Sequence, residues 1–567
     1  MKRSAMKHEM LRQGTAVFVM AVLLTAGQAV AGKATGLRVH PTNPRYFTDG
    51  SGKAIYLTGA HTWNNLVDMG PDDPPRPFDF DAYLDFLEQH GHNFIRLWTW
   101  DSTAWDTRAN RELGKGVVCR VAPLPWARTG PGKALDGKPK FDLTKFDPDY
   151  FERLRARVAA AQRRGMYVSV MLFEGWGLRH GNLGRRDAPD GWAWRAHPFH
   201  PDNNANGINA EVVGDGSSAA VHSLANPKVS ALQAAYLRKV VDTVNDLDNV
   251  LYEVINEGGE KDWDWWVAKT VRDYERTKPQ QHPVGITGHG AERLESMLAS
   301  PAEWISPGSQ DGFRDDPPAW DGQKVSLLDT DHIWGIGGSS AWAWKSFVRG
   351  HNPIFMDPHS FLDPADTRVL GKGTPEQWTG LRRSLGHTRR LAERVDLAAM
   401  TPHDELSSTK YCLAAPGVAY VVYLPAGGEA TVDLAGASGS IQVEWIHPVE
   451  GTTHQAGEVT GGGSHTFQAQ SPGAVVLFLS RQRPESRRGS DSRPLRIQDA
   501  SAAIVEATVT GPAFHAPELF QGFEDYYNPR LKRLREEYQL DKVVEGETNE
   551  FRRILKLRHW VHKPLAH

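Results

Sequence analysis

Cysteine is scarce in this sequence, and net charge is almost absent. The 567 residues include only two cysteines, Cys119 and Cys412, which lie far apart along the chain. A scaffold held by several disulfides is therefore excluded, and no Cys/His cluster has the spacing of a zinc site. We expect two free thiols, with a single bridge between domains as the alternative, and neither metal nor cofactor. The formal net charge of −3 gives no argument for nucleic acid as a partner.

Long hydrophobic runs are also lacking, apart from one near the N-terminus. Basic residues precede an apolar run at 16–26, which is too short for a membrane span, and small residues follow at 29–31. This pattern predicts a signal peptide over residues 1–31 and a mature chain that begins near Gly32. No cysteine follows to carry a lipid, and no later segment resembles a membrane span. We therefore expect a periplasmic or extracellular protein.

The sequence has no Gly-rich phosphate turn after an early strand, which disfavours a doubly wound nucleotide-binding sheet. Short apolar runs instead alternate with helical patterns, such as the helices predicted to begin at Asp79 and at Asn226-Pro227. The alternation predicts an α/β fold, a (β/α)₈ TIM barrel over residues 32–404, with an open doubly wound sheet as the alternative. The eight expected strands are 54–60, 93–100, 167–172, 249–255, 283–287, 303–306, 324–328 and 352–356.

The pattern changes near residue 405. Short alternating strands separated by Gly-rich turns predict a small all-β sandwich over 405–480, whose expected role is to brace the barrel. A charged linker follows at 481–496. Residues 497–567 have the pattern of a further domain that stops before it is finished, as in a truncated gene product.

Tryptophan is abundant, with nineteen residues. Indole rings can stack on the C–H faces of sugars, although most of them fill the core of a large protein. Those beside polar residues at strand ends are the better candidates for a ligand. Sequence alone does not decide between core and sugar platform for Trp98, Trp100, Trp176 and Trp334.

Polar and aromatic side chains follow seven of the eight expected strands. In a (β/α)₈ barrel the carboxyl ends of the strands form the active site, so this enrichment predicts function. The residues are His61, Trp63 and Asn64; Arg96, Trp98 and Trp100; Glu174 and Trp176; Asn256 and Glu257; His289; Asp329, Asp331 and His332; and Asp357.

Two carboxyl groups on opposite sides of a glycosidic bond are the requirement of glycoside hydrolysis. Glu257, after the fourth strand, fits the acid, and Asn256 beside it can bind a sugar hydroxyl. Asp331 is the expected nucleophile, with Asp329 as the reserve and His332 orienting the pair. The alternative is that the two aspartates cap a helix and order a loop.

Two other glutamates lie within or after expected strands and need an interpretation. Glu253 faces the same way as Glu257 but one layer deeper, so we expect an ion pair, with Arg96 as its partner. Glu174 is the main competitor for a catalytic role, and it could equally bind substrate hydroxyls.

The segments Gly91-His92-Asn93-Phe94-Ile95-Arg96-Leu97 and Val254-Ile255-Asn256-Glu257 resemble the clan A glycoside hydrolases, the superfamily of cellulase-type enzymes. The resemblance covers roughly residues 37–480. It implies a (β/α)₈ barrel, an acid/base role for Glu257 and support of the nucleophile by Arg96. That clan normally places a Glu nucleophile after the seventh strand, whereas this chain offers only Asp there. The retaining mechanism therefore rests on the resemblance alone.

Two finer resemblances concern the ends of the barrel and of the chain. His61-Thr62-Trp63-Asn64, Trp334-Gly335 and the sandwich after the barrel resemble the apiosidase-like branch of the clan, which often carries a C-terminal domain labelled collagen-binding. Residues 549–560 resemble the start of a transglutaminase-like domain. Its Cys-His-Asp part is absent, so no such activity is implied.

The sequence thus predicts an exported enzyme that hydrolyses a poly- or oligosaccharide. Two alternatives stay open. The first is a glycan-binding barrel that has lost its carboxylate pair, and the second is a lyase or esterase that uses Arg96 and histidines on an acidic sugar. The sugar, the linkage and the oligomeric state are not determined by the sequence.

Cleavage of the signal peptide is directly testable. When the full chain is produced in a bacterial host, N-terminal sequencing of the exported protein should give a mature end near Gly32. Replacement of Ala31 by Arg should block cleavage, because signal peptidase requires a small residue at this position. An exported wild-type chain that retains residues 1–31 would contradict the prediction.

Overall fold

The structure is a computed structural model. It describes residues 36–106, 118–180, 193–211, 219–288, 292–309, 312–358, 373–470 and 472–481. The predicted signal peptide, almost all of the linker, the C-terminal segment 497–567 and His289 lie outside the described residues.

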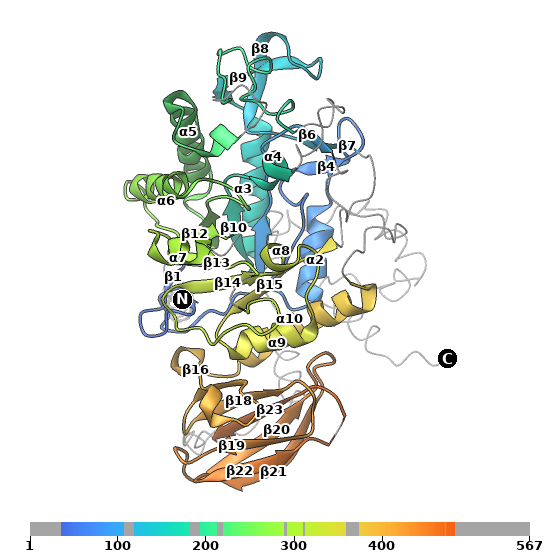
Figure 1. Ribbon diagram of the computed structural model, residues 1–567, viewed down its shortest axis with the longest axis vertical. Helices are drawn as coiled ribbons and strands as arrows, with labels where there is room; N and C mark the ends of the chain where they lie inside the picture. Colours follow the sequence, from blue (N-terminus) through green and yellow to red (C-terminus); the bar gives the residue numbers. More distant parts are fainter. Residues whose placement is uncertain are drawn as a thin grey trace, which may run out of the picture. The chain divides into compact units, whose positions relative to one another are not determined.

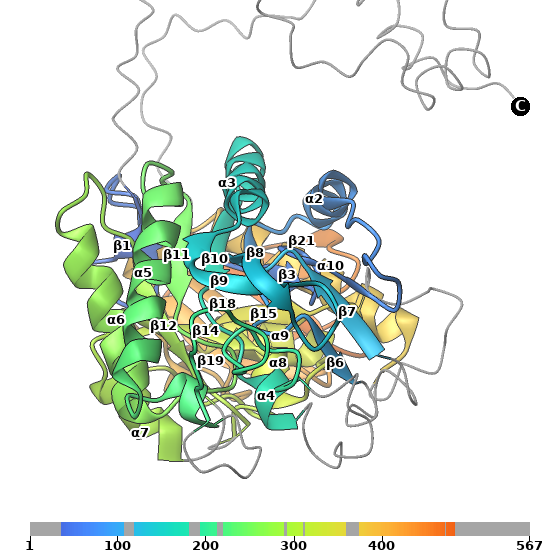
Figure 2. The ribbon, with the colours of Figure 1, turned by 90° about the horizontal axis from the view of Figure 1, so that it is seen from above.

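Eight parallel strands close into a barrel (Figures 1 and 2). Each strand pairs with its neighbours in chain order, and the last pairs with the first through Phe355↔Ala60 and Met356↔His61. The closed barrel is confirmed, and the open doubly wound sheet is wrong. The strands are β3 (Gly59–His61), β5 (Phe94–Leu97), β10 (Tyr167–Met171), β11 (Val250–Glu253), β12 (Val284–Thr287), β13 (Trp304–Ser306), β14 (Val325–Asp329) and β15 (Asn352–Met356).

The first strand is shorter than the apolar run that predicts it. Side-chain amides replace backbone partners before Gly59: the Asn352 Oδ1 accepts from the Leu57 N–H at 3.1 Å, and the Asn93 Oδ1 accepts from the Thr58 N–H at 3.0 Å. Buried backbone groups are thereby satisfied without a ladder. The hydrophobicity of the sequence does not reveal that side-chain oxygens take the place of backbone acceptors here.

Helices surround the barrel, and their caps follow the sequence. Asp79 accepts from the Ala82 N–H at 3.0 Å, and Asn226 accepts from the Lys228 N–H at 3.1 Å. The helices are α2 (Phe80–Gln89), α3 (Pro148–Arg163), α5 (Pro227–Val244), α6 (Lys261–Glu275), α7 (Glu292–Ala299), α9 (Ser340–Val348) and α10 (Pro375–Ala392), with the short α4 (Trp176–His180) and α8 (Thr330–Ile333).

The connection between β5 and α3 contains strands of its own. Strands β6 (Ala104–Asp106) and β7 (Val118–Ala122) form a small antiparallel sheet with β4 (Asp68–Gly70). Strands β8 (Trp126–Lys133) and β9 (Pro139–Phe146) form a hairpin with an irregular register. We call this part, residues 101–147, the β5–α3 insertion.

The barrel interior has an apolar layer of side chains, followed by a polar layer nearer the carboxyl ends of the strands. Phe94, Leu251 and Leu327 belong to one buried cluster. Two residues outside the barrel strands extend this cluster: Leu37, which precedes β1 (Arg38–Val39), and Phe47 of β2 (Phe47–Thr48). Side chains on one face of a strand recur every two residues. The next inward positions toward the carboxyl end are therefore Arg96, Glu253 and Asp329, all buried.

A β-sandwich follows the barrel. Its six-stranded sheet has the order β16-β17-β18-β23-β20-β21, and β19 pairs with β22. The first strand begins before the predicted boundary at 405. The strands are β16 (Thr401–Pro402), β17 (Cys412–Ala415), β18 (Ala419–Leu424), β19 (Glu429–Asp433), β20 (Ser440–Ile446), β21 (Thr453–Thr460), β22 (Ser464–Gln468) and β23 (Val475–Arg481).

Barrel helices and sandwich strands share a buried apolar cluster that includes Trp344, Leu391 and Tyr423. The Trp344 indole also donates to the Pro448 carbonyl at 3.0 Å. The sandwich thus packs against barrel helices through a shared apolar core, and its role as a brace stays a prediction. Cys119 and Cys412 are both buried, and no disulfide joins them. In the described ranges, no helix is both long and apolar enough to cross a bilayer.

Closure of the barrel requires a glycine at position 59. A Cβ there would collide with the Phe94 carbonyl of the neighbouring strand, whereas a Cβ at Gly70 in β4 would meet nothing within 4 Å. Gly59→Ala should therefore lower the free energy of unfolding by about 2–3 kcal/mol, the upper part of the range for overpacking. Gly70→Ala should change it by no more than about 0.5 kcal/mol. Thermal and urea denaturation measure both, and equal stability of the two variants would contradict the assignment.

Candidate active site

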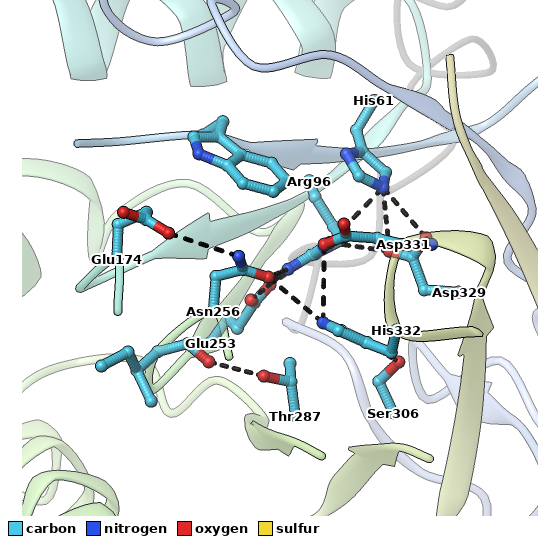
Figure 3. A network of polar contacts seen from close by, with 12 residues as sticks. His61, Arg96, Glu174, Glu253, Asn256, Thr287, Ser306, Asp329, Asp331 and His332 are labelled. Atoms are coloured by element: carbon cyan, nitrogen blue, oxygen red, sulfur yellow. Dashed lines mark hydrogen bonds and ion pairs between the residues drawn. The ribbon is translucent and has the colours of Figure 1, made fainter. Parts of the chain in front are cut away.

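One arginine joins three strands at the carboxyl end of the barrel (Figure 3). Arg96 on β5 donates to both carboxylate oxygens of Glu253 on β11, at 2.8 and 2.5 Å. Its Nη1 donates to Asp329 Oδ2 at 2.8 Å and to Asp331 Oδ2 at 3.0 Å. The Arg96–Glu253 ion pair expected from the sequence is confirmed. The same guanidinium also holds the two aspartates at the end of β14.

The two aspartates have different environments. Asp329 is fully buried; it receives the His61 Nε2–H within 3.0 Å, and it caps α8 by accepting from the Asp331 N–H at 2.9 Å. Asp331 keeps 8% of its surface exposed and contacts Arg96 and His332 through Oδ2. Its Oδ1 has no hydrogen-bond partner among the described residues. The predicted cap is thus real for Asp329, and it leaves Asp331 as the carboxyl that is open to a ligand.

The pKa values of the two aspartates move in opposite directions. Burial opposes ionisation of Asp329, but His61 and Arg96 outweigh it and hold the pKa of Asp329 well below its usual range. For Asp331, burial is again the largest effect, and the nearby Asp329 charge adds to it. Together they raise the pKa of Asp331 to about 6 despite Arg96.

Asn256 links this cluster to the opposite strands. Its Oδ1 accepts from Arg96 Nη2 at 2.9 Å and lies 3.2 Å from the His332 Nε2. His332 is oriented from its other side by the Ser306 hydroxyl of β13, at 2.8 Å. Ser306 ends the strand for which the sequence offers no site residue, so it is a member of this cluster that the sequence analysis missed.

Glu174 is buried, and its side chain bonds to the backbone of the residues that follow it. Its carboxylate accepts from the Trp176 N–H at 2.7 Å and from the Gly177 N–H at 2.9 Å, and Asn256 Nδ2 lies 3.5 Å away. Burial raises the pKa of Glu174 to about 8. The group therefore fixes the start of α4, and this local role weakens its claim as the competing catalytic residue.

Glu257 has an unusual backbone. It is buried, and its φ of 46° is one of two positive values among the described non-glycine residues. Such a conformation costs roughly 1–3 kcal/mol and persists only where the surroundings enforce it. The enforcement is visible next to it: a Cβ at Gly258 would lie 2.8 Å from the Gly175 Cα, so the loops after β10 and β11 meet backbone to backbone.

Some of the tryptophans at the strand ends are buried in the core, and others are partly exposed. Trp98 and Trp100 are 2% exposed, so the structure corrects their assignment as sugar contacts and places them in the core. Trp98 stacks on His61 at 5.4 Å, and Trp100 stacks on Trp105 at 4.9 Å. Trp63 is also buried. Trp176 and Trp334 are half-buried and keep surface that a sugar could contact.

Two further residues that were predicted to bind substrate instead make hydrogen bonds or ion pairs within the protein. Asp357 is fully buried and gives both oxygens to Arg382 of α10, at 2.6 and 2.5 Å, so it tethers a strand to a helix. Asn64 is buried and accepts from the Thr62 hydroxyl at 3.3 Å. The adjacent Asn65, which the sequence analysis passed over, joins β3 to β5 by bonding the Arg96 carbonyl and the Trp98 N–H.

Neither a metal nor a cofactor is suggested by this geometry. Within the described ranges, no group of His, Cys, Asp and Glu side chains could hold a metal ion. The expectation that the protein needs no cofactor stays a prediction.

Comparison with protein families gives two partial matches. Residues 92–299 match a domain of unknown function, DUF6298, and residues 400–476 match the "Putative collagen-binding domain of a collagenase". The second match covers the β-sandwich. No curated protein matches the chain.

Comparison with solved structures gives glycoside hydrolases. A family 5 glycoside hydrolase from Bacteroides vulgatus is 13% identical, with 79% of this chain and 94% of that chain covered and a TM-score of 0.51. A "putative glycoside hydrolase" from the same organism is 14% identical, with coverages of 80% and 83% and a TM-score of 0.52. The chain therefore has the TIM-barrel fold of these proteins, followed by a domain similar to the collagen-binding family.

The raised pKa of Asp331 predicts a pH dependence of stability. The folded state binds a proton at Asp331 between about pH 4 and pH 6, where the unfolded chain has lost it. Stability contributed by this proton is therefore lost as pH rises through this window. Asp331→Asn should remove this loss, whereas Asp81→Asn on the exposed face of α2 should keep it. Urea unfolding at a series of pH values measures the slopes, and parallel curves for Asp331→Asn and wild type would contradict the prediction.

Proposed function

We propose that this protein is an exported glycoside hydrolase in which Glu257 is the acid/base and Asp331 is its carboxylate partner. The observation that carries the proposal is the Arg96 cluster, which lies at the carboxyl ends of the barrel strands. This is where (β/α)₈ enzymes hold their reacting groups. The clan A resemblance and the fold of the structural neighbours support the same reading.

Asp331 is favoured over Asp329 because of the hydrogen bonds that each makes. A nucleophile needs an oxygen that can reach the anomeric carbon. Asp329 uses its carboxylate on His61, Arg96 and the start of α8, whereas Asp331 has Oδ1 left over. Arg96 stabilises the ionised form, which dominates above about pH 6. Asp329 is then a positioning residue that acts through Arg96 and His61.

Glu257 is favoured as the acid by its place and its backbone. It directly follows Asn256, whose side chain is part of the Arg96 cluster, and its strained φ is typical of functional sites. Asn256 is then positioned by Arg96 and His332 to receive a sugar hydroxyl next to the reacting carbon.

The proposed reaction has two steps. Asp331 attacks the anomeric carbon while Glu257 gives its proton to the departing glycosidic oxygen, which breaks the C–O bond and forms a glycosyl ester. Glu257, now ionised, takes a proton from water, whose oxygen displaces Asp331. In the inverting alternative Asp331 activates that water directly. Both routes consume one water and release two hydroxyl-ended sugars.

The finer classification is also a proposal. The His-Thr-Trp-Asn sequence at the end of β3, together with the match of the sandwich to the collagen-binding family, supports the apiosidase-like branch. Export is supported by the composition of residues 1–31, and the transglutaminase-like character of residues 549–560 by their sequence alone.

Substitution of Glu257 tests the proposal. Glu257→Gln keeps the size of the side chain but removes its proton, so kcat on an active polysaccharide should fall by about 10²–10⁴-fold. Glu260→Gln, three residues later, is the matched control because Glu260 is exposed and its side chain makes no cap hydrogen bond. Reducing-sugar release from a polysaccharide panel measures the rates, and anomeric proton NMR of the first product distinguishes retention from inversion.

Three outcomes would overturn the proposal in different ways. Full activity of Glu257→Gln would remove the acid/base assignment. Products with a new C=C bond would show a lyase. Binding of a glycan by wild type without release of any product from it would favour the glycan-binding barrel.

A further inference from the structure

A second polar pocket opens on the β5–α3 insertion. It has a volume of about 480 Å³, which is within the range of small-ligand sites. Its walls come from β7, β8 and β9 and from the segment around Arg195, which the Thr103 N–H joins through the Ala196 carbonyl at 3.1 Å. The Arg96 cluster does not line this pocket, so it is separate from the proposed catalytic site.

The pocket is rich in positive charge. Four cations and three carboxylates line it, and the carboxylates are engaged. Asp73 pairs with Lys138 at 2.6 Å, and Asp136 pairs with Arg128 at 2.5 Å. Asp147 caps α3 by accepting from the Asp149 N–H at 3.0 Å.

Two guanidinium groups remain without such partners. The side chains of Arg120 on β7 and of Arg195 make no hydrogen bond and no ion pair with the part of the chain that the structure describes, and both are half-buried. A guanidinium presents a fork of N–H donors that matches a carboxylate or a sulfate. Two of them on the walls of one pocket are available for an anion.

Aromatic rings complete the pocket. Trp126 and Phe141 line it from β8 and β9, and Arg128 lies 4.0 Å above the Phe141 ring, which fixes that side of the wall. Apolar ring surface beside charged donors suits a sugar ring that carries an acidic group. A free inorganic anion would use the arginines but not the rings.

The pocket lies beside the strand that carries Arg96. Trp126 also lines a smaller cavity together with Thr99, Trp100 and Asp101, which directly follow β5. The β5–α3 insertion thus holds a charged pocket next to the segment that follows β5 at the carboxyl end of the barrel.

We propose that this pocket is a subsite for an anionic saccharide unit, one that carries a carboxylate or a sulfate held by Arg120 and Arg195. The proposal rests on the proposed glycosidase function and adds a substrate class to it. The substrate is then an acidic glycan, whose charged unit binds at the insertion while a bond further along the chain is hydrolysed at Glu257.

The test is direct binding by isothermal titration calorimetry, with the full chain carrying Glu257→Gln to prevent turnover. The probes are trigalacturonic acid, its fully methyl-esterified form and a sulfated carrageenan tetrasaccharide. Arg120→Gln and Arg195→Gln are introduced singly into this background. Arg163→Gln is the matched control, because it removes one exposed positive charge from the far end of α3.

We expect the acidic trisaccharide or the sulfated tetrasaccharide to bind, and the tighter of the two identifies the anion. The methyl ester should bind about tenfold more weakly than the acid if the carboxylate is recognised. Each pocket variant should weaken binding about tenfold, the usual effect of losing one charged hydrogen bond, while Arg163→Gln should stay within about twofold.

Two results would overturn the subsite: binding of neither acidic probe, or binding that is unchanged in both Arg120→Gln and Arg195→Gln. These results do not depend on catalysis. If Glu257→Gln proves fully active but acidic probes still bind through the two arginines, the proposed function fails and the subsite stands. If Glu257→Gln is inactive but the acidic probes do not bind, the function stands and the subsite fails.

Discussion

The buried guanidinium of Arg96 is the constraint on which the rest of the site depends. One positive charge faces three carboxylates, those of Glu253, Asp329 and Asp331, in a layer that is almost closed to water. Burying a charge is costly unless it is paired and hydrogen-bonded. Removal of Arg96 would leave all three carboxylates without their shared partner. The arginine is therefore a requirement of folding as well as of the arrangement of the site.

One guanidinium cannot neutralise three carboxylates, and this excess of negative charge distinguishes the three carboxyl groups from one another. Glu253 takes two hydrogen bonds from Arg96, and Asp329 adds His61 and a helix cap. Asp331 is the most exposed of the three and accepts the fewest hydrogen bonds. It is therefore the carboxyl group that most readily takes up a proton, with its pKa raised to about 6. The pair of aspartates thus divides into one that holds the structure and one that can change its protonation.

Much of this arrangement follows from the sequence, because strand periodicity carries information about depth. A two-residue repeat places Glu253 on the same face as Glu257 but deeper in the barrel, which led to the prediction that it pairs with Arg96. The eight strands were also predictable from apolar runs between helical patterns. The tryptophans were not: Trp98 and Trp176 follow strands in the same way, yet only contacts between distant segments bury the first and leave the second half-exposed. Ser306 gave no signal, since a serine at a strand end is ordinary until His332 is placed against it.

The β5–α3 insertion was missed for a different reason, and this reason bears on substrate specificity. Strand β6 has only three residues, and the β8–β9 hairpin is irregular in register with Gly and Pro inside β8, so no period stands out in the sequence. Barrel strands must keep their period, because each inward side chain has to meet its neighbours in the same layer. The strands of the insertion pair with one another and with β4, outside the barrel sheet, so they have no such requirement and can vary without disturbing Arg96. Specificity for a ligand is therefore more easily varied on this insertion than on the strand ends, and Arg120 lies where such variation is tolerated.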